Sequence, residues 1–191
     1  MTGVDTRAAA FIHSSAHLYG HVEVGEGSSV WINAAVRAEA AHVKIGRFTN
    51  IQDFVMIHPD PGRPVEIGDY CSITHHATIH GSVIGNHVLV GINATVYSSR
   101  IGDNSIVGQH AYVKDGTDVP ANSIVVGAPA KIIRTANNWI ANRMNALFYH
   151  RNALAYAKGD HRAWEGPQFD AWLKEMLAQV TEEYQAMEQA A

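Results

Sequence analysis

The chain has few cysteines, few charged residues and no long apolar segment, and each of these absences excludes a class of protein. It has a single cysteine, which excludes a disulfide within one chain. Charged residues are sparse, and the formal net charge of −4 gives no electrostatic case for nucleic acid or a membrane surface. No apolar run approaches the ~20 residues of a membrane span, and the N-terminal segment has no basic stretch followed by an apolar run. These absences predict a soluble cytoplasmic protein with no nucleic-acid or membrane partner.

What the chain does have is a repeat of six residues. Isoleucine, leucine or valine recurs at this spacing over more than a hundred residues, which matches neither a helix nor an alternating strand. Such a period is typical of a parallel β-helix. The ladder consists of Ile12, Leu18, Val24, Val30, Val36, Ile45, Ile51, Ile57, Ile67, Ile73, Ile79, Ile84, Val90, Val96, Ile101, Val107, Val113, Val119 and Val125.

The spacing departs from six at one phase only, after Val36, Ile57, Ile79 and Val96. Each coil therefore has three rungs, and a single corner of the coil accepts insertions. We expect a mainly β fold, a left-handed parallel β-helix shaped as a triangular prism over residues 12–134. Coils of hexapeptide proteins are left-handed, an exception to the usual right-handed crossover.

A helical period replaces the six-residue period near the C-terminal end. Gly127-Ala128-Pro129-Ala130 breaks the repeat, and residues 135–191 are expected to form a helical extension with helices over 135–158 and 168–187. Their apolar faces should pack on the prism or on a neighbouring subunit, with a lid over the site as the alternative. These faces are Ile140, Met144, Leu147, Arg151 and Leu154, then Phe169, Trp172, Leu173, Met176, Val180 and Tyr184.

The register also places side chains directly above one another. The residue after each third rung has the same phase on successive coils, so one vertical column contains Arg37, His58, His80, Tyr97 and Lys114. Neighbouring coils lie ~4.8 Å apart, as parallel strands do. At that separation His58 and His80 can bind one metal ion, at ~2.0 Å from each nitrogen.

A third histidine lies across a corner from this column. His75 is two residues after the rung Ile73, so its side chain and that of His80 diverge on two faces of the prism. A neighbouring subunit related by a threefold axis could supply it, so we predict a homotrimer with metal sites between subunits. His76 competes with His75 by adjacency but has a worse phase. The other histidines, His87 among them, are expected to be ordinary surface or turn residues.

Cys71 is expected to be structural. It stands four residues after Ile67, a phase that other coils give to the small inward residues Ser28, Thr49, Val88 and Ser105. Buried thiols are common and inert, so a core position is favoured over a nucleophile.

Several short motifs in the repeat resemble one protein family. These are Arg37-Ala38-Glu39, Asn50-Ile51-Gln52-Asp53, His58, His75 with His80-Gly81, Val90-Gly91 and Gly127-Ala128-Pro129-Ala130-Lys131. Together they resemble the gamma-class carbonic anhydrases over roughly residues 12–134, and segment 101–108 is most similar to the branch from carnitine and phenylacetate catabolism. The resemblance implies a homotrimeric metalloenzyme in which His58, His75 and His80 bind zinc, or iron or cobalt, at the subunit interfaces.

The resemblance also implies roles for other residues. Arg37, Glu39, Gln52 and Asp53 match family positions that tie the subunits together and order the metal-bound water. Gln52 would orient the nucleophile or the substrate. Glu39 or Asp53 could accept a proton, or could form an ion pair with Arg37 across the trimer. Tyr97 continues the column beyond His80 and either lines the pocket or only packs there.

The motifs depart from the family in ways that affect the rate. The family's Arg-Gly-Asp element reads Arg37-Ala38-Glu39, and the next position is Ala40 where the best-known active members have a glutamate. The loop 59–64 also lacks the glutamate that serves there as a proton shuttle. Because carbon dioxide hydration requires proton removal from the metal-bound water, these changes predict a slow reaction.

The chemistry follows from three neutral imidazoles that leave a coordination position open. A metal-bound water would have its pKa lowered to ~7, and the resulting hydroxide could attack carbon dioxide or an ester or thioester carbonyl. A metal-dependent hydratase or hydrolase of a small molecule is therefore the leading interpretation. A hexapeptide acyltransferase using acyl-CoA shares the coil and the Gly-Ala-Pro-Ala-Lys ending, and a non-catalytic metal-binding or assembly protein would fit the missing glutamates.

Overall fold

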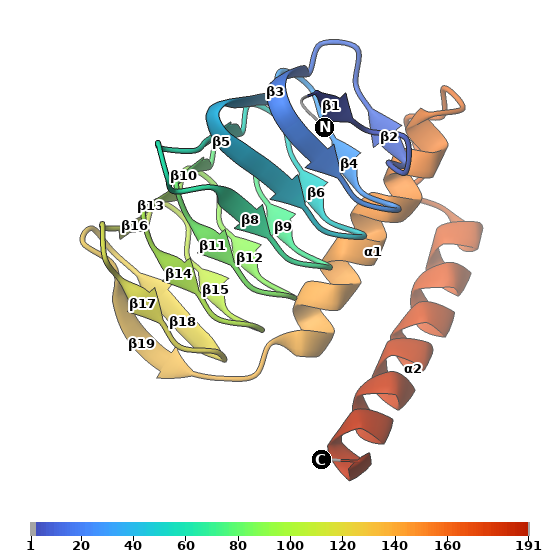
Figure 1. Cartoon of the computed structure of the whole chain (residues 1–191). Coiled ribbons are helices and arrows are strands. Elements are labelled where there is room, and N and C mark those ends of the chain that lie inside the picture. Colours follow the sequence, from blue (N-terminus) through green and yellow to red (C-terminus); the bar gives the residue numbers. More distant parts are fainter. Residues whose placement is uncertain (1–2, 191) are drawn as a thin grey trace.

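The computed structural model describes residues 3–190 and shows a solenoid of short strands with two helices beside it (Figure 1). One face of the solenoid is an eight-stranded sheet, in which each coil adds one parallel strand. Its strands are β2 (Phe11–Ile12), β4 (Ser29–Val30), β6 (Asn50–Ile51), β9 (Ser72–Ile73), β12 (Leu89–Val90), β15 (Ile106–Val107), β18 (Ser123–Val126) and β19 (Lys131–Thr135). The last strand, β19, pairs antiparallel with β18 and ends the winding.

An eleven-stranded sheet forms the other two faces. The long strand β5 (Ala35–Ile45) turns a corner, because its first residues pair with β7 and its last residues pair with β8. Each coil therefore has three faces, as the sequence predicts. The other strands are β1 (Val4–Asp5), β3 (His17–Val24), β7 (Met56–His58), β8 (Val65–Ile67), β10 (Thr78–His80), β11 (Val83–Ile84), β13 (Thr95–Tyr97), β14 (Arg100–Ile101), β16 (Tyr112–Val113) and β17 (Asp118–Val119).

The six-residue ladder forms the core of the solenoid. Every ladder residue from Val24 to Val125 is at most 3% exposed, and Ile12 and Leu18 pack on the same core. Ladder residues also pair across coils in the expected register, since Ile57 lies opposite Ile79. The sequence prediction of a hexapeptide solenoid is therefore confirmed, and its left-handed winding stays a prediction.

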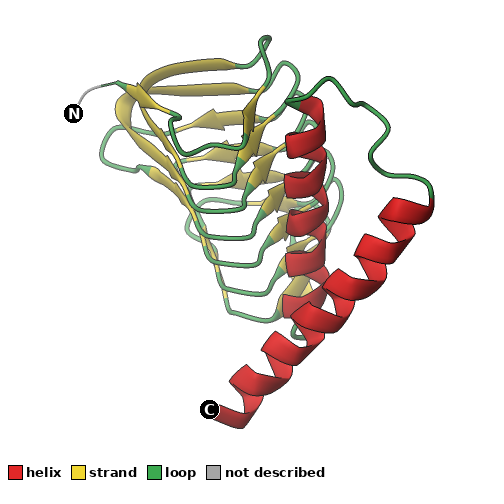
Figure 2. Ribbon diagram, turned by 90° about the vertical axis from the view of Figure 1, so that its right-hand side faces the viewer, coloured by secondary structure: helices red, strands yellow, loops and turns green. Residues whose placement is uncertain are grey.

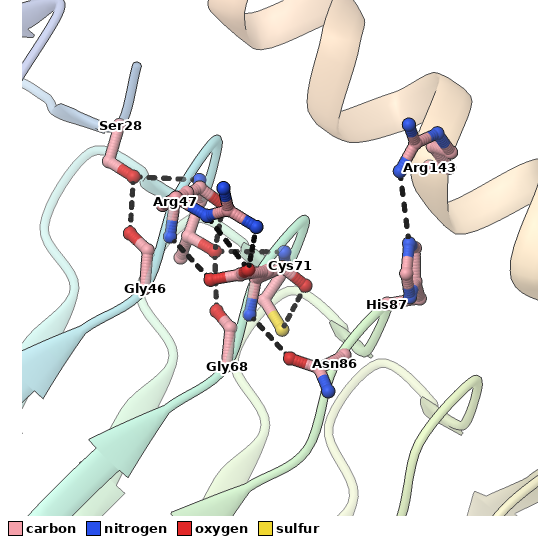
Figure 3. A network of polar contacts seen from close by, with 10 residues as sticks. Ser28, Gly46, Arg47, Gly68, Cys71, Asn86, His87 and Arg143 are labelled. Atoms are coloured by element: carbon pink, nitrogen blue, oxygen red, sulfur yellow. Dashed lines mark hydrogen bonds and ion pairs between the residues drawn. The ribbon is translucent and has the colours of Figure 1, made fainter. Parts of the chain in front are cut away.

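Small inward side chains brace the corner after the first rung. The hydroxyl of Ser28 donates to the Gly46 carbonyl at 2.6 Å (Figure 3). The thiol of Cys71 lies 3.0 Å from the Gly85 carbonyl. Burial raises the pKa of the Cys71 thiol to about 12, so the group stays protonated at neutral pH. Cys71 is thus a core residue.

The two C-terminal helices lie on one side of the solenoid (Figure 2). Helix α1 (Trp139–Tyr156) contacts β2, β4, β6 and β9 of the eight-stranded sheet, and α2 (Pro167–Ala190) packs against α1. The first helix begins later than the expected residue 135 because Lys131–Thr135 continues as β19. In α2 only Val180 is fully buried. Neither helix within residues 3–190 is long and apolar enough to cross a bilayer.

Candidate metal centre

The predicted histidine column is present on one face of the eleven-stranded sheet. His58 ends β7, His80 ends β10 and Tyr97 ends β13, and the three residues pair with one another in register. The ring centroids lie 5.1 Å apart for His58 and His80 and 5.0 Å apart for His80 and Tyr97. The Nδ1 atom of His58 faces the Nε2 atom of His80 at 3.1 Å. Register alone therefore brings two ring nitrogens within reach of one ion.

A carboxylate lies beside the remaining nitrogen of each of these rings. Oε2 of Glu39 is 3.4 Å from Nε2 of His58, and Oδ2 of Asp60 is 3.2 Å from Nδ1 of His80. Glu39 is itself held by Arg37, with N–O distances of 2.9 and 3.0 Å. The Arg37 guanidinium, and to a smaller extent His58, holds the pKa of Glu39 below its ordinary value. Glu39 is therefore an ionised acceptor at neutral pH.

His75 lies elsewhere on the same chain, at the corner that follows β9. Its Nδ1 atom is 2.8 Å from Oδ2 of Asp53, which has the same phase one coil earlier. The next residue, His76, adopts a left-handed backbone with φ of 59° and stacks on Phe54 at 4.9 Å. Within residues 3–190 no three His, Cys, Asp or Glu side chains gather into one metal-binding group. The structure thus joins His58 to His80 and leaves His75 apart from them.

The donor set fits a zinc ion. In each histidine one ring nitrogen faces a carboxylate, which favours an N–H at that nitrogen and a lone pair at the other. The facing nitrogens of His58 and His80 lie 3.1 Å apart, and when both carry lone pairs they can bind one cation between them. Two nitrogens at ~2.0–2.1 Å from a tetrahedral zinc are about 3.3 Å apart, so the observed separation needs little adjustment.

A cavity of about 440 Å³ lies next to His75, between helix α1 and the solenoid. Gln52 lines it and is almost fully buried. Two helix residues, Asn145 and Tyr149, line it as well. Burial, and secondarily the negative charge of Asp53, raises the pKa of Tyr149 to about 12. The phenol is therefore a hydrogen-bond donor at neutral pH.

A chain of buried hydrogen bonds fixes the Gln52 amide. Its Nε2 donates to Oδ1 of Asn50 at 2.9 Å, and Nδ2 of Asn50 donates to Oγ of Ser72 at 3.0 Å. Ser72 in turn donates to Oδ1 of Asn145 on α1 at 2.7 Å. Because Nε2 of Gln52 is occupied in this way, its Oε1 is left to accept a hydrogen bond.

Three residues of this region were not singled out from the sequence. Asp60 lies in the loop between β7 and β8, and Asn145 and Tyr149 are one helical turn apart on α1. The polar spacing of the two helix residues was a usable signal, although it does not reveal which face of the solenoid α1 covers. Within one chain Arg37 pairs with Glu39 and Asp53 pairs with His75, and the ion pair with Arg37 across the trimer stays a prediction. Tyr97 stacks on His80 and is 38% exposed.

Known structures share the solenoid. A hexapeptide transferase family protein from Anaplasma phagocytophilum superposes with a TM-score of 0.70 at 25% identity, over 82% of this chain and 91% of that one. A Bacillus cereus protein named as a candidate acetyltransferase has a TM-score of 0.77 at 25% identity, over 81% and 91% of the two chains. The fold therefore defines a protein of the hexapeptide-repeat class.

Sequence relatives narrow this class. A probable carbonic anhydrase of Methanocaldococcus jannaschii is 43% identical over 141 residues, which cover 72% of this chain and 89% of that protein. The mitochondrial gamma carbonic anhydrase 2 of Arabidopsis thaliana is 28% identical over 186 residues, 93% of this chain and 67% of that protein. No family model matches the chain. On these relatives, the chain belongs to the gamma carbonic anhydrase family.

Proposed function

We propose that the protein is a metal-dependent hydratase or hydrolase of the gamma carbonic anhydrase type. In the proposed site, His58 and His80 of one subunit and His75 of the partner subunit bind zinc, or iron or cobalt, in a homotrimer. The observation that carries the proposal is the pairing of every one of these histidines with its own carboxylate, which prepares the opposite nitrogen as a ligand. The cytoplasmic location and the place in the carnitine and phenylacetate branch stay predictions from the sequence.

The residues around the site have distinct tasks in this proposal. A bound zinc ion would supply a nucleophile at neutral pH by lowering the pKa of a coordinated water to about 7. Gln52 presents a fixed Oε1 that can accept a hydrogen bond from the attacking group, and Tyr149 can donate one to a substrate oxygen. The apolar part of the cavity lining includes Leu89 and Ile106.

Glu39 and Asp53 act as orienting groups rather than as proton acceptors. A general base works best when its pKa lies near the operating pH, and the Arg37 ion pair moves the pKa of Glu39 in the opposite direction. Asp53 is engaged by His75 at 2.8 Å. With Ala40 in place of a glutamate as well, proton removal should limit the rate, and carbon dioxide hydration should be slow.

A hexapeptide acyltransferase is the second candidate. The cavity beside His75, about 440 Å³ with both apolar and polar lining residues, has room for an acyl group larger than carbon dioxide. An acyltransferase would use one histidine as a base and would not need bound metal. A non-catalytic metal-binding protein is the third candidate, since it would retain the histidines without a fast reaction.

The shared site can be tested by mixing inactive subunits. His75→Ala and His58→Ala chains should each form trimers without metal or activity. Mixed trimers regain a complete site wherever an intact His58 and His80 face an intact His75. Random mixing therefore restores about a quarter of the sites of the wild-type trimer. The matched control mixes His58→Ala with His80→Ala, and it should restore nothing because both ligands belong to the same side of the interface.

The measurements are metal content, trimer mass, carbon dioxide hydration and acyl-CoA hydrolysis. Restored metal with restored hydration or hydrolysis supports the proposal, whereas restored metal without either activity favours the non-catalytic alternative. Acyl transfer by metal-free wild-type protein would favour the acyltransferase. A monomer that binds one metal per chain would overturn the shared site.

A further inference from the structure

The insertions in the six-residue repeat place acidic side chains against the histidine column. Glu39 lies in the first insertion, between rungs Val36 and Ile45, and it faces His58. Asp60 lies in the second insertion, between rungs Ile57 and Ile67, and it faces His80 on the next coil. The irregular corner of the prism is therefore the source of both carboxylates that approach the column.

The backbone of the second insertion is held in a tight turn. The amide of Asp60 donates to the Arg63 carbonyl at 3.1 Å, and the amide of Arg63 donates back at 2.9 Å. Arg63 also bonds to Asp115, at 3.0 Å. The hydrogen bonds of the turn involve the main chain of Asp60, and its carboxylate takes no part in them. Among residues 3–190, that carboxylate has one ion-pair contact, with His80.

The His80 side of the contact is equally restricted. Its Nδ1 atom is buried and has no aligned hydrogen bond, and Oδ2 of Asp60 approaches it at 3.2 Å. Contacts of this kind are often long until the site closes around its ligand. Gly81 keeps the approach open, because a Cβ there would lie 3.3 Å from the same Oδ2, on a backbone with φ of +50°.

We propose that Asp60 is a positioning residue that sets the ring of His80 for metal binding. Its carboxylate accepts the Nδ1–H of His80, which fixes the tautomer and turns Nε2 toward His58. Such outer partners are worth about 10–100-fold in metal affinity. The inference rests on the proposed function, since it requires His80 to be a metal ligand. In this proposal the loop 59–64, which lacks the shuttle glutamate, serves to orient a metal ligand.

The test compares the affinity of the trimer for Zn²⁺ and Co²⁺ in Asp60→Ala, Asp60→Asn, Asp60→Glu and wild type. Affinity is measured by chelator competition, and the visible spectrum of the Co²⁺ form reports the coordination geometry. We expect a roughly 10–100-fold loss for Asp60→Ala, a smaller loss for Asp60→Asn and partial recovery in Asp60→Glu. Asp115→Asn is the matched control, because it releases the same loop through Arg63 without touching Asp60.

The outcomes separate this inference from the function it rests on. If the wild type binds neither ion, the proposed function fails. If the wild type binds metal and both Asp60→Ala and Asp60→Asn bind it equally well, only the role of Asp60 fails. If Asp115→Asn weakens binding as much as Asp60→Ala, loop order rather than the carboxylate is responsible, and the inference is overturned. Should Asp60→Ala unfold, the near-isosteric Asp60→Asn decides alone.

Discussion

Two stacks of aromatic rings run along the solenoid, with neighbouring rings spaced as the coils are. Each stack contains histidine. The histidine column has His58, His80 and Tyr97, with centroids 5.1 and 5.0 Å apart. The corner stack, made of Phe48, Tyr70, His87 and Trp139, has centroid separations of 5.1, 5.3 and 5.0 Å. Centroid spacing alone therefore does not distinguish a proposed ligand histidine from a packing one.

The charges around the two stacks do distinguish them. The column has a carboxylate beside each histidine ring, whereas the corner stack has Arg143 of α1 against its rings, with smaller opposing effects of Asp103 and Asp69 on His87. The Arg143 guanidinium lies 4.0 Å from the Tyr70 centroid and 4.9 Å from that of Trp139, and a nitrogen of it is 3.4 Å from His87 Nε2 (Figure 3). Burial, and next the Arg143 charge, lowers the pKa of His87 to about 4. A cation beside the ring disfavours a second cation, so His87 serves to anchor the helix.

The largest expected difference between the stacks is in metal binding. His80→Ala should lose affinity for Zn²⁺ by more than the roughly 10–100-fold that loss of an outer partner costs, and His87→Ala should keep wild-type affinity. His75→Ala and its neighbour His76→Ala form a second matched pair with the same contrast. Metal analysis of the purified trimers measures both. Equal metal loss in His80→Ala and His87→Ala would break the comparison.

A smaller effect, on the pH dependence of stability, is expected from His87 in the corner stack. The pKa of His87 is about 4 in the folded chain and 6.5 ordinarily. Between these values the unfolded chain binds a proton that the folded chain does not, so stability falls as pH drops from about 6.5 to about 4. After allowance for the partly exposed ring, the loss is about 1–2 kcal/mol.

The variant His87→Phe keeps the stack and removes the titration. Its unfolding free energy, measured with denaturant at several pH values, should fall less than that of the wild type between pH 6.5 and 5. Carboxylates shared by both proteins cancel in this difference. Parallel curves for the two proteins would show that His87 is not held neutral by its surroundings.

The histidine column could be predicted from the sequence, as could the shared phase of Phe48, Tyr70 and His87, but the helix residues that complete the corner stack could not. A strict six-residue register fixes which side chains share a face, so His58, His80 and Tyr97 follow from counting. His87 was assigned to the ordinary surface or turn histidines. Its surroundings come from Trp139 and Arg143, more than fifty residues later in the chain, and no local period predicts where a helix docks.

The same limit applies within the proposed metal site. Asp53 and His75 share a phase on neighbouring coils, so their contact is a consequence of the repeat. Asp60 is in an insertion, where the register stops and the turn between Asp60 and Arg63 decides the direction of the side chain. Insertions therefore carry information that the repeat cannot supply, and here they carry acidic partners of the proposed ligands.

The smallest effect concerns the ion pair of Arg37 and Glu39 beside the histidine column. Arg37 and Glu39 have side chains 48% and 54% exposed, so solvent and salt screen their attraction. Arg37→Gln should leave the unfolding midpoint at pH 7 nearly unchanged. Because the folded pKa of Glu39 is lowered, any stability from the pair is present above the ordinary glutamate pKa and disappears as pH falls through the lowered value. Thermal unfolding curves of the variant and the wild type should converge in acid, and curves that diverge there would mean that Glu39 depends on a partner other than Arg37.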